Sequence, residues 1–179
     1  MEAALKTFFS SPRFAVAGAS SDPTKYGHKG TPLRHLCRAS PSSWTPLTPQ
    51  TNSPPVFAWY LQHSLPVTAI NPRARTVTVL KKDHSTVSGL SSLPDAPSFS
   101  LSVITPPKVT RELLKEAKEA GIPAVWLQPG SFDEEGLEYA RKEFKAAIAG
   151  DGGEGGEGWC VLVDGEDAMA LAGRKWSKL

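Results

Sequence analysis

The sequence predicts an α/β fold: a doubly wound, mostly parallel sheet of five strands with helices on both faces. Short apolar runs alternate with amphipathic segments along the chain, which is the pattern of consecutive strand–helix units. Several of the apolar runs stop at a glycine or a proline, where a strand would end. A length of 179 residues suits one domain of this kind, so we expect a single domain over residues 1–179.

The N-terminal part is expected to supply one helix, one strand and a turn. Leu5, Phe8 and Phe9 fall on one face of a helix over residues 2–9. An apolar strand over residues 14–17 follows and leads into a turn of small residues. Asp22 is a suitable N-cap for the next helix, with Pro23 at its first position.

Two segments have compositions that do not build a core. Residues 30–55 contain six prolines and many serines and threonines, which would break any regular element. We interpret them as a disordered insertion that splits the first crossover helix, which resumes over residues 56–63. Residues 150–158 are rich in glycine and glutamate and are expected to form a loop.

The remaining pattern is regular. Strands are expected over residues 67–70, 101–105, 124–127 and 159–163, because each run is apolar and bounded by turn residues. Residues 77–80 are typical of a short extended segment, and residues 86–93 of a small turn or helix. Helices are expected over residues 109–120, 133–148 and 166–176. Gly121 would end the first of these, and the second begins with an acidic turn that suits the helix dipole.

The carboxyl ends of parallel strands meet at one edge of a sheet, where ligands of such folds bind. Four strands end there in small or proline-containing loops, which begin at Gly18, Asn71, Thr105 and Gln128. The first loop lacks a full glycine fingerprint, since Ser20 takes the place of the second glycine and Pro23 of the third. Its low bulk still allows a phosphate to approach the backbone, and Lys25 could contact that phosphate.

The end of the second strand indicates which nucleotide would bind. Domains that bind NAD usually place an acid there for the ribose hydroxyl, whereas this strand ends in Asn71, Pro72 and Arg73, with Arg75 close behind. A guanidinium can pair with a phosphorylated ribose that a carboxylate would repel. The sequence therefore argues against NAD and favours coenzyme A or NADP.

Composition narrows the class of partner. A net charge of +2 gives no reason to expect nucleic acid or a membrane surface as a partner. No apolar run approaches the ~18 residues of a spanning helix, and the N-terminus has no signal-peptide pattern. Two cysteines make neither a disulfide framework nor a metal site. We expect a reducing compartment, the cytoplasm first, with the mitochondrion left open; the oligomeric state is also open.

The chain displays no catalytic set. Its histidines, His28, His35, His63 and His84, are scattered and none has metal-ligand spacing. No serine elbow or cysteine–histidine pair stands out. Cys160 is expected on a buried strand, as an inert small side chain. Catalytic and metal-binding residues are therefore assigned to none, and whether any reaction is catalysed stays open.

Four motifs together resemble the CoA-binding domain family. These are small stand-alone proteins similar to the nucleotide-binding domain of the succinyl-CoA synthetase α subunit. The motifs are FAVAGASSDPTKYG at residues 14–27, VTAINP at 67–72, VITPP at 103–107 and VWLQPG at 125–130. The resemblance covers most of the chain except residues 30–55 and the glycine-rich loop. In the family the first helix normally follows the first motif directly, so either a real insertion or a retained intron accounts for residues 30–55.

The resemblance implies a Rossmann-like domain that binds CoA or an acyl-CoA by its nucleotide portion at the carboxyl ends of the strands. The first loop would approach the pyrophosphate, the second the ribose, and the third the adenine or the pantetheine. The residues implied in binding are Gly18, Ala19, Ser20, Lys25, Asn71, Pro72, Arg73, Thr105, Pro106, Pro107, Gln128, Pro129 and Gly130. Two other interpretations stay open: an NADP-binding oxidoreductase-like or regulatory protein, and a partner-binding module with a vestigial pocket.

Overall fold

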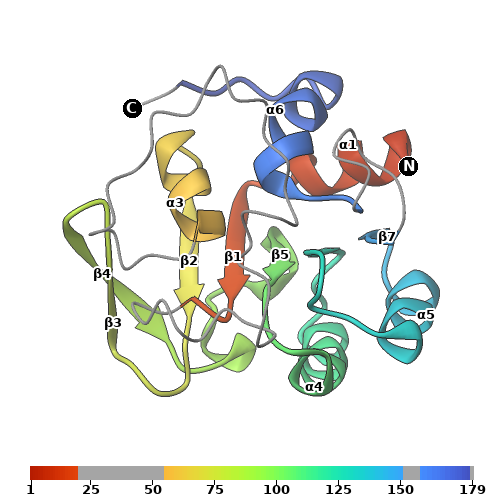
Figure 1. Cartoon of the computed structure of the whole chain (residues 1–179), viewed down its shortest axis with the longest axis horizontal. Coiled ribbons are helices and arrows are strands. Elements are labelled where there is room, and N and C mark those ends of the chain that lie inside the picture. Colours follow the sequence, from red (N-terminus) through yellow and green to blue (C-terminus); the bar gives the residue numbers. More distant parts are fainter. Residues whose placement is uncertain (20–54, 151–157, 178–179) are drawn as a thin grey trace.

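The fold is a seven-stranded, mostly parallel sheet between two layers of helices (Figure 1). The computed structural model describes residues 1–19, 55–150 and 158–177. Across the sheet the strand order is β3-β4-β2-β1-β5-β6-β7. All neighbours are parallel except β3 and β4, which form an antiparallel pair at one edge. The strands are β1 (Arg13–Ala17), β2 (Val67–Ile70), β3 (Thr76–Val79), β4 (Lys82–Val87), β5 (Phe99–Val103), β6 (Ala124–Leu127) and β7 (Ala146–Ile148).

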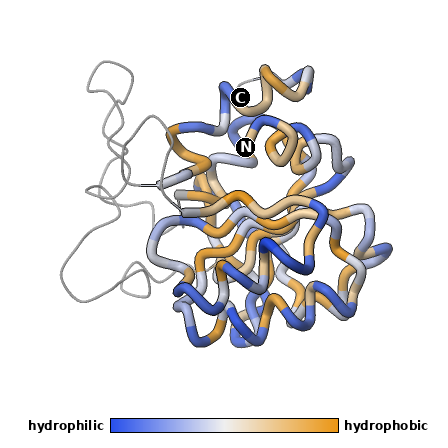
Figure 2. Tube along the Cα trace, turned by 90° about the vertical axis from the view of Figure 1, so that its right-hand side faces the viewer, coloured by the Kyte–Doolittle hydropathy of each residue, from blue (hydrophilic) through white to orange (hydrophobic). Residues whose placement is uncertain are grey.

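Each face of the sheet has its own hydrophobic cluster and its own helices. One face packs against α1 (Glu2–Ser10), α3 (Pro55–Gln62) and α6 (Val161–Leu171). The other packs against α4 (Pro107–Glu119), α5 (Glu134–Glu143) and the short 3-10 turns η2 (Leu90–Ser92) and η3 (Ala96–Ser98). Figure 2 shows the mostly apolar strands running between these layers. The predicted helices on both faces are thus confirmed.

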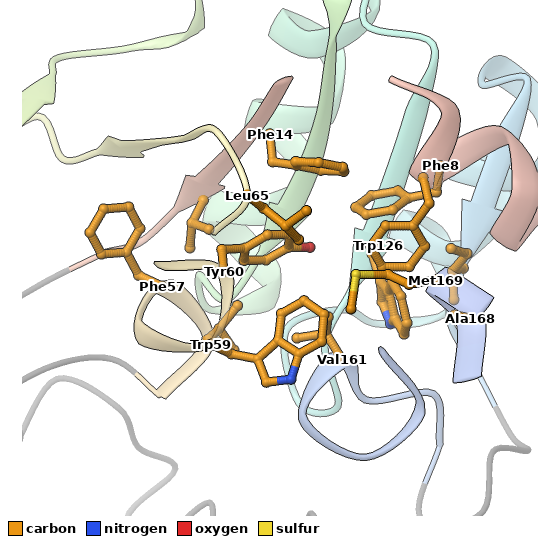
Figure 3. Close-up of a cluster of buried hydrophobic side chains, with 14 of the residues drawn as sticks. Phe8, Phe14, Phe57, Trp59, Tyr60, Leu65, Trp126, Val161, Ala168 and Met169 are labelled. Atoms are coloured by element: carbon orange, nitrogen blue, oxygen red, sulfur yellow. The ribbon is translucent and has the colours of Figure 1, made fainter. Parts of the chain in front are cut away.

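Aromatic side chains from α1, β1, α3 and β6 fill the core on the first face (Figure 3). Phe8 of α1 contacts the rings of Phe14 and Trp126, with centroids 5.7 and 5.5 Å apart. The Tyr60 ring of α3 lies 5.3 Å from the ring of Phe14, and its hydroxyl is hydrogen-bonded to Ser102 Oγ at 2.7 Å. These contacts hold α1 and α3 against the centre of the sheet.

Helix α6 crosses this face in the direction opposite to the strands. Its first residue, Val161, donates its N–H to Gln128 Oε1 beyond the carboxyl end of β6, at 3.0 Å. After its last turn, Arg174 donates to the carbonyls of Phe9 and Ser11, just before the amino end of β1. The start of α6 therefore lies at the carboxyl edge of the sheet.

The predicted number of strands was wrong. Residues 159–163 are not a strand: Trp159 and Cys160 precede α6, and Val161 begins it. The apolar, β-branched run is typical of a strand, but here it is the buried first turn of a helix. The Asp164 carboxylate accepts the Cys160 N–H at 2.8 Å, so an acidic side chain in the first turn pairs a backbone N–H at the helix start.

Three further strands were not predicted as such. The helix expected over residues 133–148 ends at Glu143, and Ala146–Ile148 forms β7 against β6. The segment expected as a turn or helix over 86–93 holds the end of β4 and then η2. The extended run at 77–80 is β3, which turns into β4 through Leu80 and Lys81.

Several predictions fall outside the described residues. These are the disordered insertion at 30–55, except for Pro55 at the start of α3, the helix start at Asp22, and the glycine-rich loop between Gly150 and Gly158. Within the parts of the chain that the structure describes, no helix combines the length and the apolar character that crossing a membrane would require.

Candidate functional site

The predicted binding loops lie at one edge of the sheet, where the parallel strands end (Figure 1). Gly18 and Ala19 follow β1; Asn71, Pro72 and Arg73 follow β2. The other two loops are Thr105–Pro107 after β5 and Gln128–Gly130 after β6. Ser20 and Lys25 lie outside the described residues. The edge therefore carries every described residue that the sequence assigned to the site.

Gly18 makes the closest approach between the loops. Its backbone has φ +98°, a conformation that side chains rarely adopt. A Cβ at this position would lie 3.1 Å from both Ile104 Cγ1 and Thr105 Cγ2. The first loop thus rests directly on the start of the loop after β5, and only glycine fits there. The Gly18 N–H donates to the Ile70 carbonyl at 3.3 Å, so the loop is also tied to the end of β2.

Asn71 ties the second loop to the first. Its Nδ2 donates to the Ala19 carbonyl at 2.7 Å, and its Oδ1 accepts the backbone N–H groups of Arg73 and Ala74 at 2.8 and 3.1 Å. The Asn71 side chain is therefore engaged in holding the loops. Arg73 and Arg75 are exposed, and within the described residues neither has an ion pair with a carboxylate.

The loop after β5 leads directly into α4. The helix begins at Pro107, two residues earlier than predicted, with Pro106 as its N-cap. Thr105 Oγ1 and Thr110 Oγ1 are hydrogen-bonded at 2.8 Å, which ties this loop to the first turn of the helix. Proline at the first helical position costs no hydrogen bond, because that N–H would be unpaired. The loop is consequently rigid where it contacts Gly18.

The turn after β6 holds two buried polar groups that have no partner. Ser131 N–H donates to the Gln128 carbonyl at 3.0 Å, and Gly130 between them has φ +81°. Gln128 Nε2 and Ser131 Oγ are buried without a hydrogen bond. Groups of this kind are rare in native proteins, and a bound ligand or water is one explanation. A polar ligand that brings a hydrogen-bond acceptor to this turn would complete both groups.

Sequence reasoning missed Ser131 and the start of α6. Ser131 lies one residue beyond the predicted loop, and a serine in a turn is too common to stand out. Val161 was missed because its segment was interpreted as a strand. The acidic Asp164 soon after an apolar run was the available signal for a helix start there.

The described histidines lie away from the loops at the carboxyl edge. Within the described ranges no three His, Cys, Asp or Glu residues are grouped so that they could hold a metal ion. His63 is stacked on Trp59, with ring centroids 4.1 Å apart, and His84 contacts Phe57. Both imidazoles belong to the packing around α3 rather than to the loops.

Comparison with known proteins agrees with this picture. A family model described as a CoA binding domain matches residues 46–153, more than half of the chain. The match begins after β1 and the Gly18 loop, so it covers the elements from α3 to β7. Among curated proteins, none matches the sequence.

Solved structures support the fold. A hypothetical protein from Pyrococcus horikoshii OT3 is similar with a TM-score of 0.61 and 17% identity, over 94% of this chain and 92% of that one. A conserved hypothetical protein from Pyrococcus furiosus has a TM-score of 0.50 and 23% identity, over 75% and 90%. Prb, a protein redesigned for binding, has a TM-score of 0.57 and 14% identity, over 98% and 94%. At these identities the likeness shows the α/β fold alone.

Proposed function

The chain belongs to the CoA-binding domain family, and on this premise we propose that the carboxyl edge of its sheet binds coenzyme A or an acyl-CoA through the nucleotide portion. The observation that carries the proposal is the close fit of the first loop. Gly18 packs on Ile104 and Thr105, and Ala19 is held by Asn71. The first loop is thereby fixed at the carboxyl edge of the sheet, and its described residues carry no side chain larger than a methyl group.

The strand order supports a Rossmann-like site. From β4 to β7 the order is β4-β2-β1-β5-β6-β7, which matches the doubly wound arrangement in which connections leave β1 and its neighbour in opposite directions. Ligands of such folds bind in the crevice at that point. Here the crevice falls between β1 and β5, where Gly18 meets Thr105.

Within the proposal, each loop meets one part of the ligand. Gly18 and Ala19, with Ser20 and Lys25 beyond the described residues, contact the pyrophosphate. Arg73 pairs with the phosphate on the ribose, because it is exposed beside the loop that Asn71 holds in place. The loops after β5 and β6 extend the site on the other side of β1. The proposed function is binding, and no residue of the edge is assigned a catalytic role.

The test compares CoA with dephospho-CoA, which lacks the ribose phosphate, by calorimetric titration. We expect CoA to bind about 10-fold more tightly, since a charge-assisted hydrogen bond contributes about 1.5–3 kcal/mol. Arg73→Ala should abolish this preference. Arg13→Ala is the matched control, because it removes the same charge at the amino end of β1, the opposite edge of the sheet. Equal binding of both ligands by the unmodified protein would contradict the role of Arg73.

A further inference from the structure

The turn after β6 is built at a cost to the folded protein. Gln128 and Ser131 are each only 3% exposed, and yet Gln128 Nε2 and Ser131 Oγ have no hydrogen-bond partner. A buried donor without a partner loses its hydration and gains nothing in return. Two such atoms within one four-residue turn indicate that a polar group of a bound ligand completes their hydrogen bonds.

The amide donor of Gln128 is fixed in place, and Ser131 is held through its backbone N–H, which donates to the Gln128 carbonyl at 3.0 Å. The Gln128 amide is oriented by its oxygen, which accepts the N–H of Val161 at the first residue of α6. The chain entering α6 is held as well, since Trp159 donates its N–H to the Gly150 carbonyl at 3.3 Å and its own carbonyl accepts Trp126 Nε1 at 3.0 Å. The amide nitrogen of Gln128 is therefore a preorganised donor beside the start of a helix.

The charges around this turn select the kind of acceptor. A helix start carries a partial positive charge, which favours an acceptor oxygen. However, Asp164 is buried there and its carboxylate already accepts the Cys160 N–H at 2.8 Å. A ligand group with a full negative charge would lose its hydration in this buried turn, which costs far more than burying a neutral acceptor. A neutral carbonyl oxygen suits the site better than a phosphate.

The position of the turn indicates where that carbonyl comes from. β6 neighbours β5, with Val103 paired to Leu127, so the turn lies two strands from β1, or about 10 Å at the usual strand spacing. A nucleotide bound at β1 and β2 would not fill this place, but the arm attached to its pyrophosphate can reach it. In CoA that arm carries amide carbonyls and, when acylated, a thioester carbonyl.

We infer that Gln128 Nε2 and Ser131 Oγ donate hydrogen bonds to a neutral carbonyl oxygen of the pantetheine arm or its thioester. The inference rests on the proposed function and extends it. The turn after β6 binds the pantetheine arm, whereas the loops after β1 and β2 bind the nucleotide. A ligand that ends at the nucleotide should not use this turn.

The experiment titrates the full chain by calorimetry with CoA, acetyl-CoA and 3′,5′-ADP, which lacks the arm. Ser131→Ala removes only the unpaired hydroxyl. It should weaken binding of at least acetyl-CoA by about 2- to 10-fold, the effect of one hydrogen bond, and leave 3′,5′-ADP unchanged. A loss for acetyl-CoA alone assigns the thioester carbonyl; an equal loss for CoA assigns a pantetheine amide.

The matched control is Ser100→Ala, the same change at a buried serine whose hydroxyl already has a partner, the Phe8 carbonyl at 2.8 Å. Without ligand, Ser100→Ala should lower the melting temperature, while Ser131→Ala should leave it unchanged or raise it. In the titrations the two variants should differ in the opposite sense: Ser131→Ala should bind acetyl-CoA more weakly, and Ser100→Ala should bind it as tightly as the unmodified protein. Gln128→Glu keeps an acceptor for Val161 and replaces the donor, so it should show the same arm-specific loss.

The outcomes separate this inference from the proposed function. If the unmodified protein binds CoA but Ser131→Ala and Gln128→Glu bind all three ligands as tightly, the inference is overturned and the proposed function stands. An equal loss for 3′,5′-ADP and CoA also overturns it, because the turn would then act on the nucleotide. If the unmodified protein binds none of the three ligands, the proposed function fails, and the inference with it.

Discussion

At the scale of single residues, the proposed site depends on contacts that particular side chains allow or forbid. Gly18 permits the first loop to rest on Ile104 and Thr105 because it has no Cβ. The Asn71 amide holds the first two loops together, and Arg73 and Arg75, which follow it, are both exposed. The sequence indicated both Gly18 and Arg73, since strand ends and small residues can be recognised locally.

Gly18→Ala should destabilise the protein more than Gly130→Ala. Both residues have positive φ, which costs an alanine about 1–2 kcal/mol. At Gly18 the new Cβ would also lie 3.1 Å from two side chains, which adds about 1–3 kcal/mol of overpacking, whereas nothing lies within 4 Å at Gly130. Urea unfolding of both variants measures the difference. Equal losses would mean that the first loop is not packed as described.

Ser131 could not be found in this way. Its distinguishing property is the lack of a partner in a buried place, and that depends on how β6, α6 and the turn between residues 128 and 131 come together. A single sequence shows which groups can form hydrogen bonds but not which of them remain unpaired after folding.

At the scale of elements, α6 shows how tertiary contacts decide local structure. The helix approaches α3 so closely that a Cβ on Gly165 would lie 2.4 Å from Trp59 Cζ2. A second link is the hydrogen bond of 3.0 Å between His63 Nε2 and Glu166 Oε1. These contacts bury Gly165 within α6 and hold the first turn of α6 at the edge of the sheet. The apolar run over residues 159–163, which has the composition of a strand, therefore leads into a helix.

Gly165→Ala should lower stability although alanine is the better helix former by about 1 kcal/mol. Trp59 is 5% exposed and cannot move aside easily, so overpacking of about 1–3 kcal/mol or more should outweigh the gain. Gly136→Ala in α5 is the matched control, because its Cβ would lie no closer than 3.3 Å to another atom. Thermal unfolding should show a loss for the first variant and little change for the second. A stabilised Gly165→Ala would refute the close packing of α3 and α6.

The strands that sequence reasoning missed share a physical cause. β7 consists of good helix formers, and it is extended because Ala124 to Trp126 of β6 offers it a partner. The β3–β4 turn uses Leu80 and Lys81 at φ 51° and 62°, where glycine or asparagine would be the usual signal. In both places the hydrogen bonds between paired strands outweigh the intrinsic conformational preference of the residues. By contrast, β1, β2, β5 and β6 are apolar or bounded by clear turn residues, and all four were predicted, although the strand expected over 101–105 runs over Phe99–Val103.

At the scale of the whole molecule, the core and the site share the central strands. Tyr60 of α3 is buried against Phe14 of β1, and its hydroxyl is bonded to Ser102 of β5. Ala17 and Val103, at the ends of those two strands, lead into the loops that hold the proposed ligand. Packing on the first face therefore fixes the spacing of the loops as well as the stability of the fold.

Tyr60→Phe should make the protein less sensitive to alkaline pH. Burial raises the pKa of Tyr60 well above its usual range, although the bond to Ser102 opposes the shift. The unfolded chain then loses this proton near pH 10 while the folded chain keeps it, so stability falls as the pH rises above about 10. Urea unfolding between pH 9 and 11 should show a smaller decline in the variant. The same decline in both proteins would contradict the buried position of Tyr60.

The measurement that tests the central claim most directly is calorimetric titration of the full chain with CoA, with NAD and NADP as parallel controls. The account predicts saturable binding of CoA and no binding of NAD, because the end of β2 offers Arg73 and no acid for a ribose hydroxyl. Binding of NADP without CoA, or silence towards all three ligands, would contradict the account.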